Sequence, residues 1–168
     1  KRHPKLNTVL LNGKVHHFDD VNIGVAVSLR EGLIVPVVKQ TDKKSVADIA
    51  KETTELADKA RVGSLLPDEL GGGTFTISVL GSVDGFTPIL NAGQSAILGV
   101  GRSVETPVVR KGEVVVREMM TLSLTVDHQV IDGAVAASFL RRLQQESSLP
   151  LLVFTALLFL PSLIFSIT

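Results

Sequence analysis

The stretch Thr121-Leu-Ser-Leu-Thr-Val-Asp-His-Gln-Val-Ile-Asp-Gly133 is the most informative part of the chain. Its first half alternates apolar and polar residues, which predicts a strand with one face in the core. The strand leads into His128, and a carboxylate, Asp132, follows four residues later beside a glycine. The unperturbed pKa of histidine lies near neutrality, so His128 is a candidate general base at the end of a rigid strand. A histidine after a strand can also be a structural residue held by hydrogen bonds. The spacing alone therefore leaves both the catalytic and the structural role open.

The composition fits one globular domain with a substantial core. The chain has 168 residues, of which 45% are hydrophobic. Lys+Arg and Asp+Glu both number 17, and this balance argues against general electrostatic binding to nucleic acid or to an anionic membrane. Cysteine is absent, which excludes disulfides, thiolate metal sites and a cysteine nucleophile. Trp and Tyr are also absent, so a stacking platform for nucleic acid is not expected.

Hydrophobic periodicity and turn residues predict a mixture of strands and helices. Asn12-Gly13 predicts a tight hairpin turn, and Lys111-Gly112 predicts a second one. Pro36 lies within an apolar run and indicates an edge strand or a bulge, because proline donates no ladder hydrogen bond. The expected strands are 21–30, 33–38, 74–78, 95–100 and the arms of hairpins 6–18 and 106–127, with helices at 45–60 and 133–145 and a loop at 79–94.

The helix over residues 45–60 has clear start and stop signals. Ser45 is a good N-cap, Asp48 can complete a capping box, and Gly63 follows where a C-terminal glycine belongs. Its apolar residues recur at helical spacing and predict one buried face. That face comprises Val46, Ile49, Ala50, Thr53, Leu56, Ala57 and Ala60.

Three other patterns suggest ligand sites, and each has a simpler explanation. His16 and His17 are adjacent on a predicted strand and point to opposite faces, so we expect no metal there. The run Gly71-Gly-Gly73 lacks the Lys-Ser/Thr of a phosphate loop. Gly99-Val-Gly101 is only part of a dinucleotide fingerprint, because Val104 stands where the third glycine is needed.

The signature resembles a known enzyme family. His-x-x-x-Asp-Gly after an apolar strand is similar to the motif of the CoA-dependent acyltransferases. The longer form Asp-His-x-Val-Ile-Asp-Gly resembles the dihydrolipoyl acyltransferase catalytic core of the 2-oxoacid dehydrogenase complexes, such as pyruvate dehydrogenase. Five further blocks resemble this core in the same order, at residues 1–7, 21–27, 32–38, 72–78 and 94–101.

The resemblance implies an α/β (α+β) sandwich with a chloramphenicol-acetyltransferase-like fold, in which a mixed, mainly antiparallel sheet carries helices on one face. It implies acyl transfer between the dihydrolipoyl thiol and coenzyme A. By the same resemblance His128 is the general base, Ser78 donates its hydroxyl to the oxyanion, and Asp132 holds the loop. Each site would lie between two subunits of a homotrimer, with the histidine on one subunit and the serine on the other.

The resemblance also implies partners. The trimers would build a cage-like core that works with a lipoyl domain on separate residues, a decarboxylase and a dihydrolipoyl dehydrogenase. Bacterial cytoplasm is favoured over the mitochondrial matrix. The acyl group stays open among acetyl, succinyl and branched-chain groups.

Three departures from the family pattern leave an alternative open. The family's opening helix and first strand, which carry the expected basic partner of Asp132, have no counterpart before Lys1. Gln129 stands where the family usually has arginine, and Val79 replaces a polar residue beside Ser78. The alternative function is therefore a non-catalytic scaffold or inactive fragment of the same fold.

The two ends of the chain differ in character. Residues 1–145 are expected to form the acyltransferase core, and residues 146–168 an apolar tail of uncertain origin. No charged residue occurs from Leu149 to Thr168, a length that could span a bilayer. Pro150 and Pro161 argue against a regular span, and residues 155–168 resemble nothing in the family. We expect no membrane partner and interpret these last residues as foreign to the fold, with a small membrane-anchored protein as the alternative.

Overall fold

The computed structural model describes residues 2–146 and 151–154. The strands are β1 (Thr8–Leu11), β2 (Lys14–His17), β3 (Ile23–Val25), β4 (Val27–Ser28), β5 (Leu33–Ile34), β6 (Val37–Val38), β7 (Phe75–Val79), β8 (Ala96–Arg110), β9 (Glu113–Val126) and β10 (Leu151–Phe154); the helices are α1 (Val46–Val62) and α2 (Gly133–Glu146), with 3-10 turns η1 (Pro4–Leu6), η2 (Thr41–Lys43) and η3 (Pro67–Glu69).

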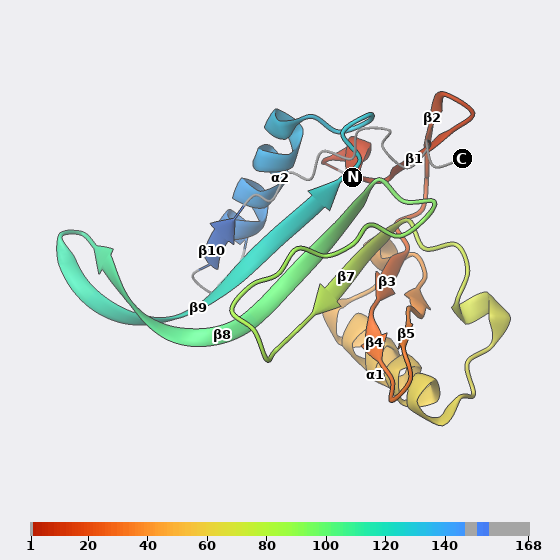
Figure 1. The fold of residues 1–168 in the computed structure, drawn as a ribbon, viewed down its shortest axis with the longest axis horizontal. Helices are drawn as coiled ribbons and strands as arrows, with labels where there is room; N and C mark the ends of the chain where they lie inside the picture. The colour runs from red at the N-terminus through yellow and green to blue at the C-terminus, as the bar shows by residue number, and fades with distance from the viewer. Residues whose placement is uncertain (1, 147–150, 155–168) are drawn as a thin grey trace, which may run out of the picture.

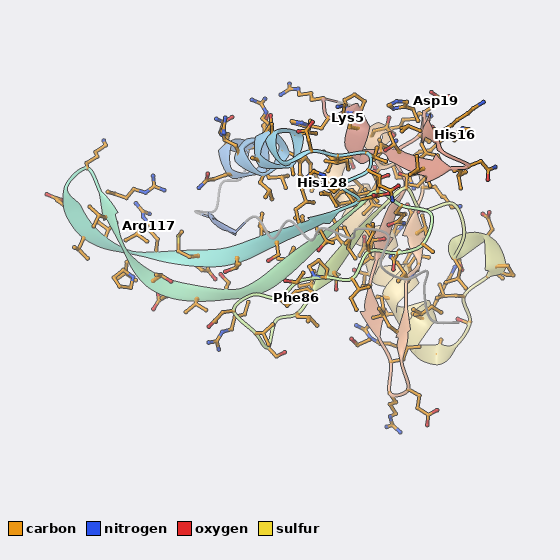
Figure 2. The ribbon with its side chains drawn as sticks, turned by 45° about the horizontal axis from the view of Figure 1, so that its top comes forward. Lys5, His16, Asp19, Phe86, Arg117 and His128 are labelled. Atoms are coloured by element: carbon orange, nitrogen blue, oxygen red, sulfur yellow. The ribbon has the colours of Figure 1, made fainter. Side chains whose placement is uncertain are left out.

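A mixed sheet of six strands forms the centre of the structure, in the order β10-β9-β8-β7-β3-β6 (Figure 1). The long pair β8–β9 is antiparallel, and β8, β7 and β3 run parallel to one another. The outer parts of β8 and β9 project far from the sheet (Figures 1 and 2). Among the described residues, two of the five pairings in this sheet are antiparallel, which agrees with the predicted mixed sheet. The separate pairs β1–β2 and β4–β5 are antiparallel as well.

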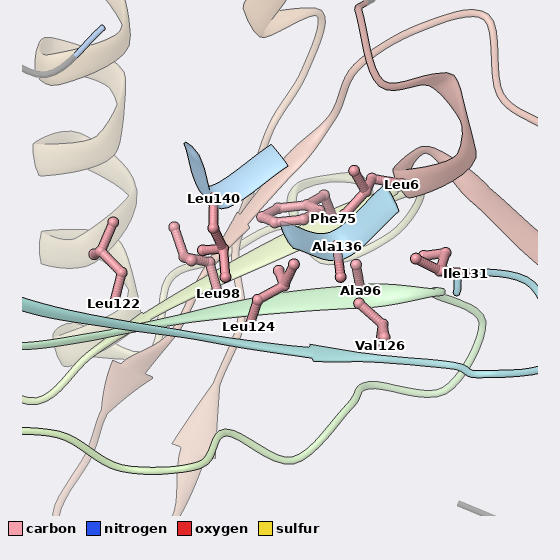
Figure 3. Packing of buried hydrophobic residues seen from close by; sticks show 10 residues of the cluster. All are labelled: Leu6, Phe75, Ala96, Leu98, Leu122, Leu124, Val126, Ile131, Ala136 and Leu140. Atoms are coloured by element: carbon pink, nitrogen blue, oxygen red, sulfur yellow. The ribbon is translucent and has the colours of Figure 1, made fainter. Parts of the chain in front are cut away.

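The core lies between the sheet and α2 (Figure 3). Leu124 and Val126 of β9 are fully buried, as is Ala136 of α2. These residues alternate along the strand with polar ones, as the sequence pattern predicts. The buried cluster comprises Leu6, Phe75, Ala96, Leu98, Leu122, Leu124, Val126, Ile131, Ala136 and Leu140.

Both long helices cover the same face of the sheet. One hollow is lined by Ile49 and Thr53 of α1, and another by Phe139 and Leu143 of α2. The two hollows share the sheet residue Ile77, together with Val21 and Ile23. The predicted layering, with helices on one face, is therefore confirmed.

Two predicted strands are broken in the structure. Residues 21–30 form β3 and β4, and residues 33–38 form β5 and β6. The second break falls at Pro36, whose carbonyl accepts a hydrogen bond from Val25 N at 2.9 Å but which has no N–H to return. β6 lies at the edge of the sheet, where the sequence places this proline.

The end signals of α1 are confirmed, but its predicted buried face is partly wrong. Ser45 and Asp48 form the capping box, and Gly63 ends the helix in the left-handed region at φ 70°. Leu56 and Ala60 are buried, whereas Val46 is 84% exposed. Ala50 is also exposed and Ile49 is half-buried, so the apolar face begins later along the helix than periodicity suggests.

The start of the predicted tail joins the sheet, since β10 pairs in parallel with residues 120–123 of β9. The predictions for residues 155–168 lie outside the described residues. Within the described part of the chain, no helix combines the length and the apolar character needed to cross a membrane.

Candidate active site

The signature folds into a tight turn between β9 and α2. Asp127 N donates a hydrogen bond to Ser95 O at 2.9 Å, which holds the end of β9 against β8. The Asp127 carbonyl then accepts hydrogen bonds from Val130 N at 3.0 Å and Ile131 N at 2.9 Å. His128 lies half-buried in this turn, and Figure 2 shows it at the end of the long strand. The backbone therefore presents the imidazole from a fixed position.

Asp132 immediately precedes α2 and lies close to a basic side chain. Its Oδ1 accepts a hydrogen bond from Val135 N at 2.9 Å, and its Oδ2 lies 3.9 Å from Lys5 Nζ. The Val135 N–H is the largest influence and lowers the pKa of Asp132. Partial burial comes next and raises it, while Lys5, the Ala134 N–H and His128 lower it by smaller amounts, so the net shift is downward. Asp132 is therefore an anionic helix cap next to the candidate base.

A buried polar network ties the start of the chain to this turn. Thr8 Oγ1 donates to Lys5 O at 2.7 Å, and Ser95 Oγ donates to Thr8 O at 2.7 Å. Both side chains are almost fully buried. Because Ser95 also accepts from Asp127, the network connects η1 and β1 to the signature. Neither Lys5 nor this network is visible in the sequence, since no local spacing joins residues that lie so far apart along the chain.

Ser78 lies near the end of β7, at the opposite end of the sheet from His128. It pairs with Gly99 of β8, which in turn pairs with Ser123 of β9. His128 follows Ser123 by five residues along a strand that runs the other way. With the usual rise per residue and strand spacing, the two side chains are roughly 15–20 Å apart. The structure brings His128 and Asp132 together but keeps Ser78 away from them within one chain.

The segment 80–94 lies across the face of the sheet that carries Ser78. Gly101 allows its close approach: a Cβ atom there would lie 2.1 Å from the Asp84 carbonyl oxygen. At Gly99 a Cβ atom would meet Pro88 and Phe86 at 3.0 and 3.1 Å. These glycines, which resemble part of a dinucleotide motif in the sequence, thus serve to admit the loop.

Side-chain hydrogen bonds fasten the same loop from its other end. Thr76 Oγ1 donates to Gln94 Oε1 at 2.7 Å and accepts from Asn91 Nδ2 at 2.9 Å. Gln94 Nε2 also donates to Gly73 O at 3.1 Å. Thr76 is fully buried, so this network sets where the loop returns to the sheet, near the start of β7.

The adjacent histidines of β2 and the glycine run before β7 also have defined positions in the structure. In the β1–β2 register His16 pairs with Val9 and His17 with Thr8, which places the two histidines on opposite faces. In the glycine run, Gly71 O accepts from Lys39 Nζ at 2.6 Å and Gly72 O accepts from Asn22 Nδ2 at 2.9 Å. These carbonyls anchor the entry into β7.

Comparison with known proteins agrees with this geometry. Residues 1–153 match the family of 2-oxoacid dehydrogenases acyltransferase (catalytic domain). The chain is 44% identical over 149 residues to the dihydrolipoyllysine-residue acetyltransferase component of the pyruvate dehydrogenase complex of Staphylococcus aureus, a match that covers 86% of this chain and 35% of the relative. The corresponding protein of Staphylococcus epidermidis is also 44% identical, with 34% of its length covered.

Solved structures show the same fold. The dihydrolipoamide acetyltransferase of Azotobacter vinelandii superposes with a TM-score of 0.78 at 41% identity, covering 86% of this chain and 61% of that one. That structure was studied for the role of a serine, a histidine and an asparagine in its catalytic mechanism. The cubic core of a pyruvate dehydrogenase multienzyme complex gives a TM-score of 0.79 at 40% identity, with the same coverage.

The chain spans about a third of the length of these curated relatives and about three fifths of the solved catalytic cores. The family match nevertheless extends over nearly all of it and includes the signature turn. The chain therefore belongs to the 2-oxoacid dehydrogenase acyltransferase family and carries part of its catalytic domain.

Proposed function

We propose that this chain transfers an acyl group between a dihydrolipoyl thiol and coenzyme A, with each site shared by two copies. The signature turn carries the proposal, because it places His128 and the anionic cap Asp132 side by side. In the Azotobacter vinelandii relative the asparagine follows the histidine by four positions and the serine precedes it by about fifty. His128, Asp132 and Ser78 have the same order and similar spacing here.

The proposed chemistry needs one base and one hydrogen-bond donor. His128 takes the proton from the attacking thiol, since the thiolate is the nucleophile. The thiolate adds to the thioester carbonyl carbon, and the Ser78 hydroxyl donates a hydrogen bond to the resulting oxyanion. When the intermediate collapses, the departing thiolate takes the proton back from the imidazolium. The enzyme forms no covalent bond, which suits a chain without cysteine.

The separation of the two residues supports a shared site. A general base and an oxyanion donor must both lie within hydrogen-bonding reach of one reacting thioester. A gap of roughly 15–20 Å within one chain is too wide for that. We therefore place His128 of one copy opposite Ser78 of the next, in a homotrimer that assembles further into a cage. Its proposed partners are a lipoyl domain, a decarboxylase and a dihydrolipoyl dehydrogenase, and the bacterial relatives favour the cytoplasm.

Mixing two inactive variants tests this proposal directly. We would measure transfer from acetyl-CoA, succinyl-CoA and isobutyryl-CoA to dihydrolipoamide for the wild type, His128→Ala and Ser78→Ala. Each variant should lose activity, by about 10²- to 10⁴-fold for the base and about 10²- to 10³-fold for the donor. After unfolding and refolding together, random assembly should restore about one site in four, since each site draws on two copies.

The results of these assays distinguish a catalytic site shared between copies from a non-catalytic scaffold. Acetyl transfer is the expected preference, because the relatives are acetyltransferases. Restored activity in the mixture supports the shared site, whereas a mixture no better than its parts would show that the two residues do not act across copies. An assembled wild type without turnover would favour the non-catalytic scaffold, for which Gln129 and Val79 in place of the family's residues are the motivating features.

A further inference from the structure

The turn that carries His128 is fixed by backbone hydrogen bonds on both sides of the histidine. Before it, Asp127 N donates to Ser95 O at 2.9 Å, which extends the β8–β9 pairing by one step. After it, Gln129 N donates to Asp127 Oδ1 at 3.0 Å, and Ile131 N donates to the Asp127 carbonyl at 2.9 Å. The position of the imidazole therefore depends on Ser95, the residue against which Asp127 is held.

Ser95 is fixed in turn by Thr8, which lies far from it along the chain. Ser95 Oγ donates to the Thr8 carbonyl at 2.7 Å, and the two hydroxyl oxygens lie 3.2 Å apart. Thr8 Oγ1 donates to Lys5 O at 2.7 Å, so each hydroxyl proton has a carbonyl acceptor. Thr8 is 0% exposed and Ser95 1%, so water cannot replace a partner that is removed.

The same early segment of the chain also holds the far side of the turn. Lys5 Nζ lies 3.9 Å from Asp132 Oδ2. Leu6 is buried in the cluster that contains Ile131, the residue before Asp132. Figure 2 shows Lys5 and His128 at the same end of the long strands. This segment thus contacts the signature both before and after the histidine.

We propose that Thr8 is a positioning residue: its buried contact with Ser95 holds the signature turn so that His128 reaches the reacting thiol. This role rests on the proposed function, in which the imidazole acts on a substrate bound against a second copy. A general base must be held within about 0.5 Å of its productive position. A displacement of about 1 Å can lower the rate about 10²-fold. Thr8 is buried, so it acts through Ser95 and Asp127 and not on the substrate.

A purely structural role is the competing explanation, because a buried and hydrogen-bonded threonine adds to stability wherever it lies. The two roles differ in what a substitution changes. A loss of stability alone lowers the amount of folded protein. Displacement of the base lowers kcat of the folded protein and leaves KM for the substrates unchanged, since the lost interaction concerns only the transition state.

Steady-state kinetics on folded, assembled protein provide the first test. Acetyl transfer to dihydrolipoamide would be measured for wild type, Thr8→Val, Thr8→Ser and Leu56→Ala, with circular dichroism and light scattering on the same samples. Thr8→Val should lower kcat at least about tenfold with KM unchanged, and Thr8→Ser should restore most of the loss. Leu56 is buried on α1, so Leu56→Ala should lower stability but keep kcat within about twofold of wild type. Equal kcat values for Thr8→Val and Leu56→Ala would overturn the proposal.

Ser95→Ala tests the same contact from its other side, because it deletes the hydroxyl that donates to the Thr8 carbonyl. It should lower kcat to a similar extent as Thr8→Val. The double variant Thr8→Val/Ser95→Ala should lie within about twofold of the slower single variant, since residues that act as one unit are not additive. Losses that multiply would show that Thr8 does not act through Ser95.

Chemical modification of His128 gives a readout that needs no turnover. Diethyl pyrocarbonate acylates neutral imidazoles, and peptide mass spectrometry would compare half-buried His128 with His16, which is exposed on β2. Thr8→Val should raise the rate at His128 relative to His16, because the released turn exposes the imidazole, whereas Thr8→Ser and Leu56→Ala should not. An unchanged ratio in Thr8→Val would overturn the positioning role. A raised ratio in a chain without acyl transfer would support that role and refute the proposed function alone.

Discussion

Lys5 Nζ lies 3.9 Å from Asp132 Oδ2, and this pair joins the first turn of the chain to the cap of the helix that follows the signature. Both side chains are about half exposed, so the pair by itself contributes little to stability. Its significance is positional: it adds positive charge beside a carboxylate that already accepts a backbone hydrogen bond from Val135. The anionic form of Asp132 is thereby favoured next to His128.

This arrangement predicts a specific pH dependence of stability for Asp132→Asn. The pKa of Asp132 is lowered in the folded state, above all by the Val135 N–H, so the carboxylate stabilises the fold above its usual pKa of 3.8. That contribution disappears as the pH falls through the lower, folded-state pKa. Urea unfolding of wild type and variant between pH 7 and pH 2 should show a wild-type advantage at neutral pH that vanishes in acid.

Two further variants separate the contribution of the helix cap at Asp132 from that of the nearby Lys5 charge. Asp132→Ala removes the helix cap that asparagine keeps, so it should be less stable than Asp132→Asn at every pH. Lys5→Met should reduce the wild-type advantage only in part, because Lys5 is a smaller influence than Val135. A wild-type advantage that persists unchanged at pH 2 would contradict the assignment.

Gly101→Ala should displace the loop over the sheet. The new Cβ atom would lie 2.1 Å from the Asp84 carbonyl oxygen, which is backbone and cannot rotate away. We expect a loss of about 1–3 kcal/mol in the free energy of unfolding. Gly81→Ala is the control, because a Cβ atom there meets nothing within 4 Å, and it should change stability by less than about 0.5 kcal/mol. Equal effects in chemical denaturation would contradict the close approach.

Leu124→Ala tests the core under α2. Leu124 is fully buried at the centre of the cluster in Figure 3, and truncation should cost about 2–5 kcal/mol. Val46→Ala, at a site that is 84% exposed, should change the free energy of unfolding by less than about 0.5 kcal/mol. A large effect at Val46 would show that the first turn of α1 packs against another part of the protein.

Thr76→Val tests the polar anchor of the loop. The substitution keeps the shape but leaves the amide groups of Asn91 and Gln94 without their shared hydroxyl partner. Because the site is buried, we expect a loss of about 1–3 kcal/mol, with faster proteolysis within residues 80–94 than in the wild type. Thr76→Ser, which retains the hydroxyl, should recover most of the difference. If valine and serine behave alike, the hydrogen bonds do not hold the loop.

Local signals in the sequence were sufficient to predict the helices and the tight turns. The capping box of Ser45 and Asp48, the terminal Gly63 and the hairpin turns at Asn12-Gly13 and Lys111-Gly112 all act within a few residues. Their geometry depends on backbone conformation and nearby hydrogen bonds, so spacing along the chain predicts them. The resemblance of the signature likewise identified the family, and the match over residues 1–153 confirms it.

Tertiary structure decided the features that depend on strands far apart in sequence. The register across β7, β8 and β9 separates Ser78 from His128, and it also places Val109 and Val114 opposite each other in the projecting parts of β8 and β9. The same packing requires glycine at Gly101. These outcomes arise from which strand lies beside which and how far each is shifted, and no local pattern encodes that. Sequence alone thus determined the family, the helices and the candidate residues, whereas only the fold showed that one copy cannot bring the proposed base and oxyanion donor together.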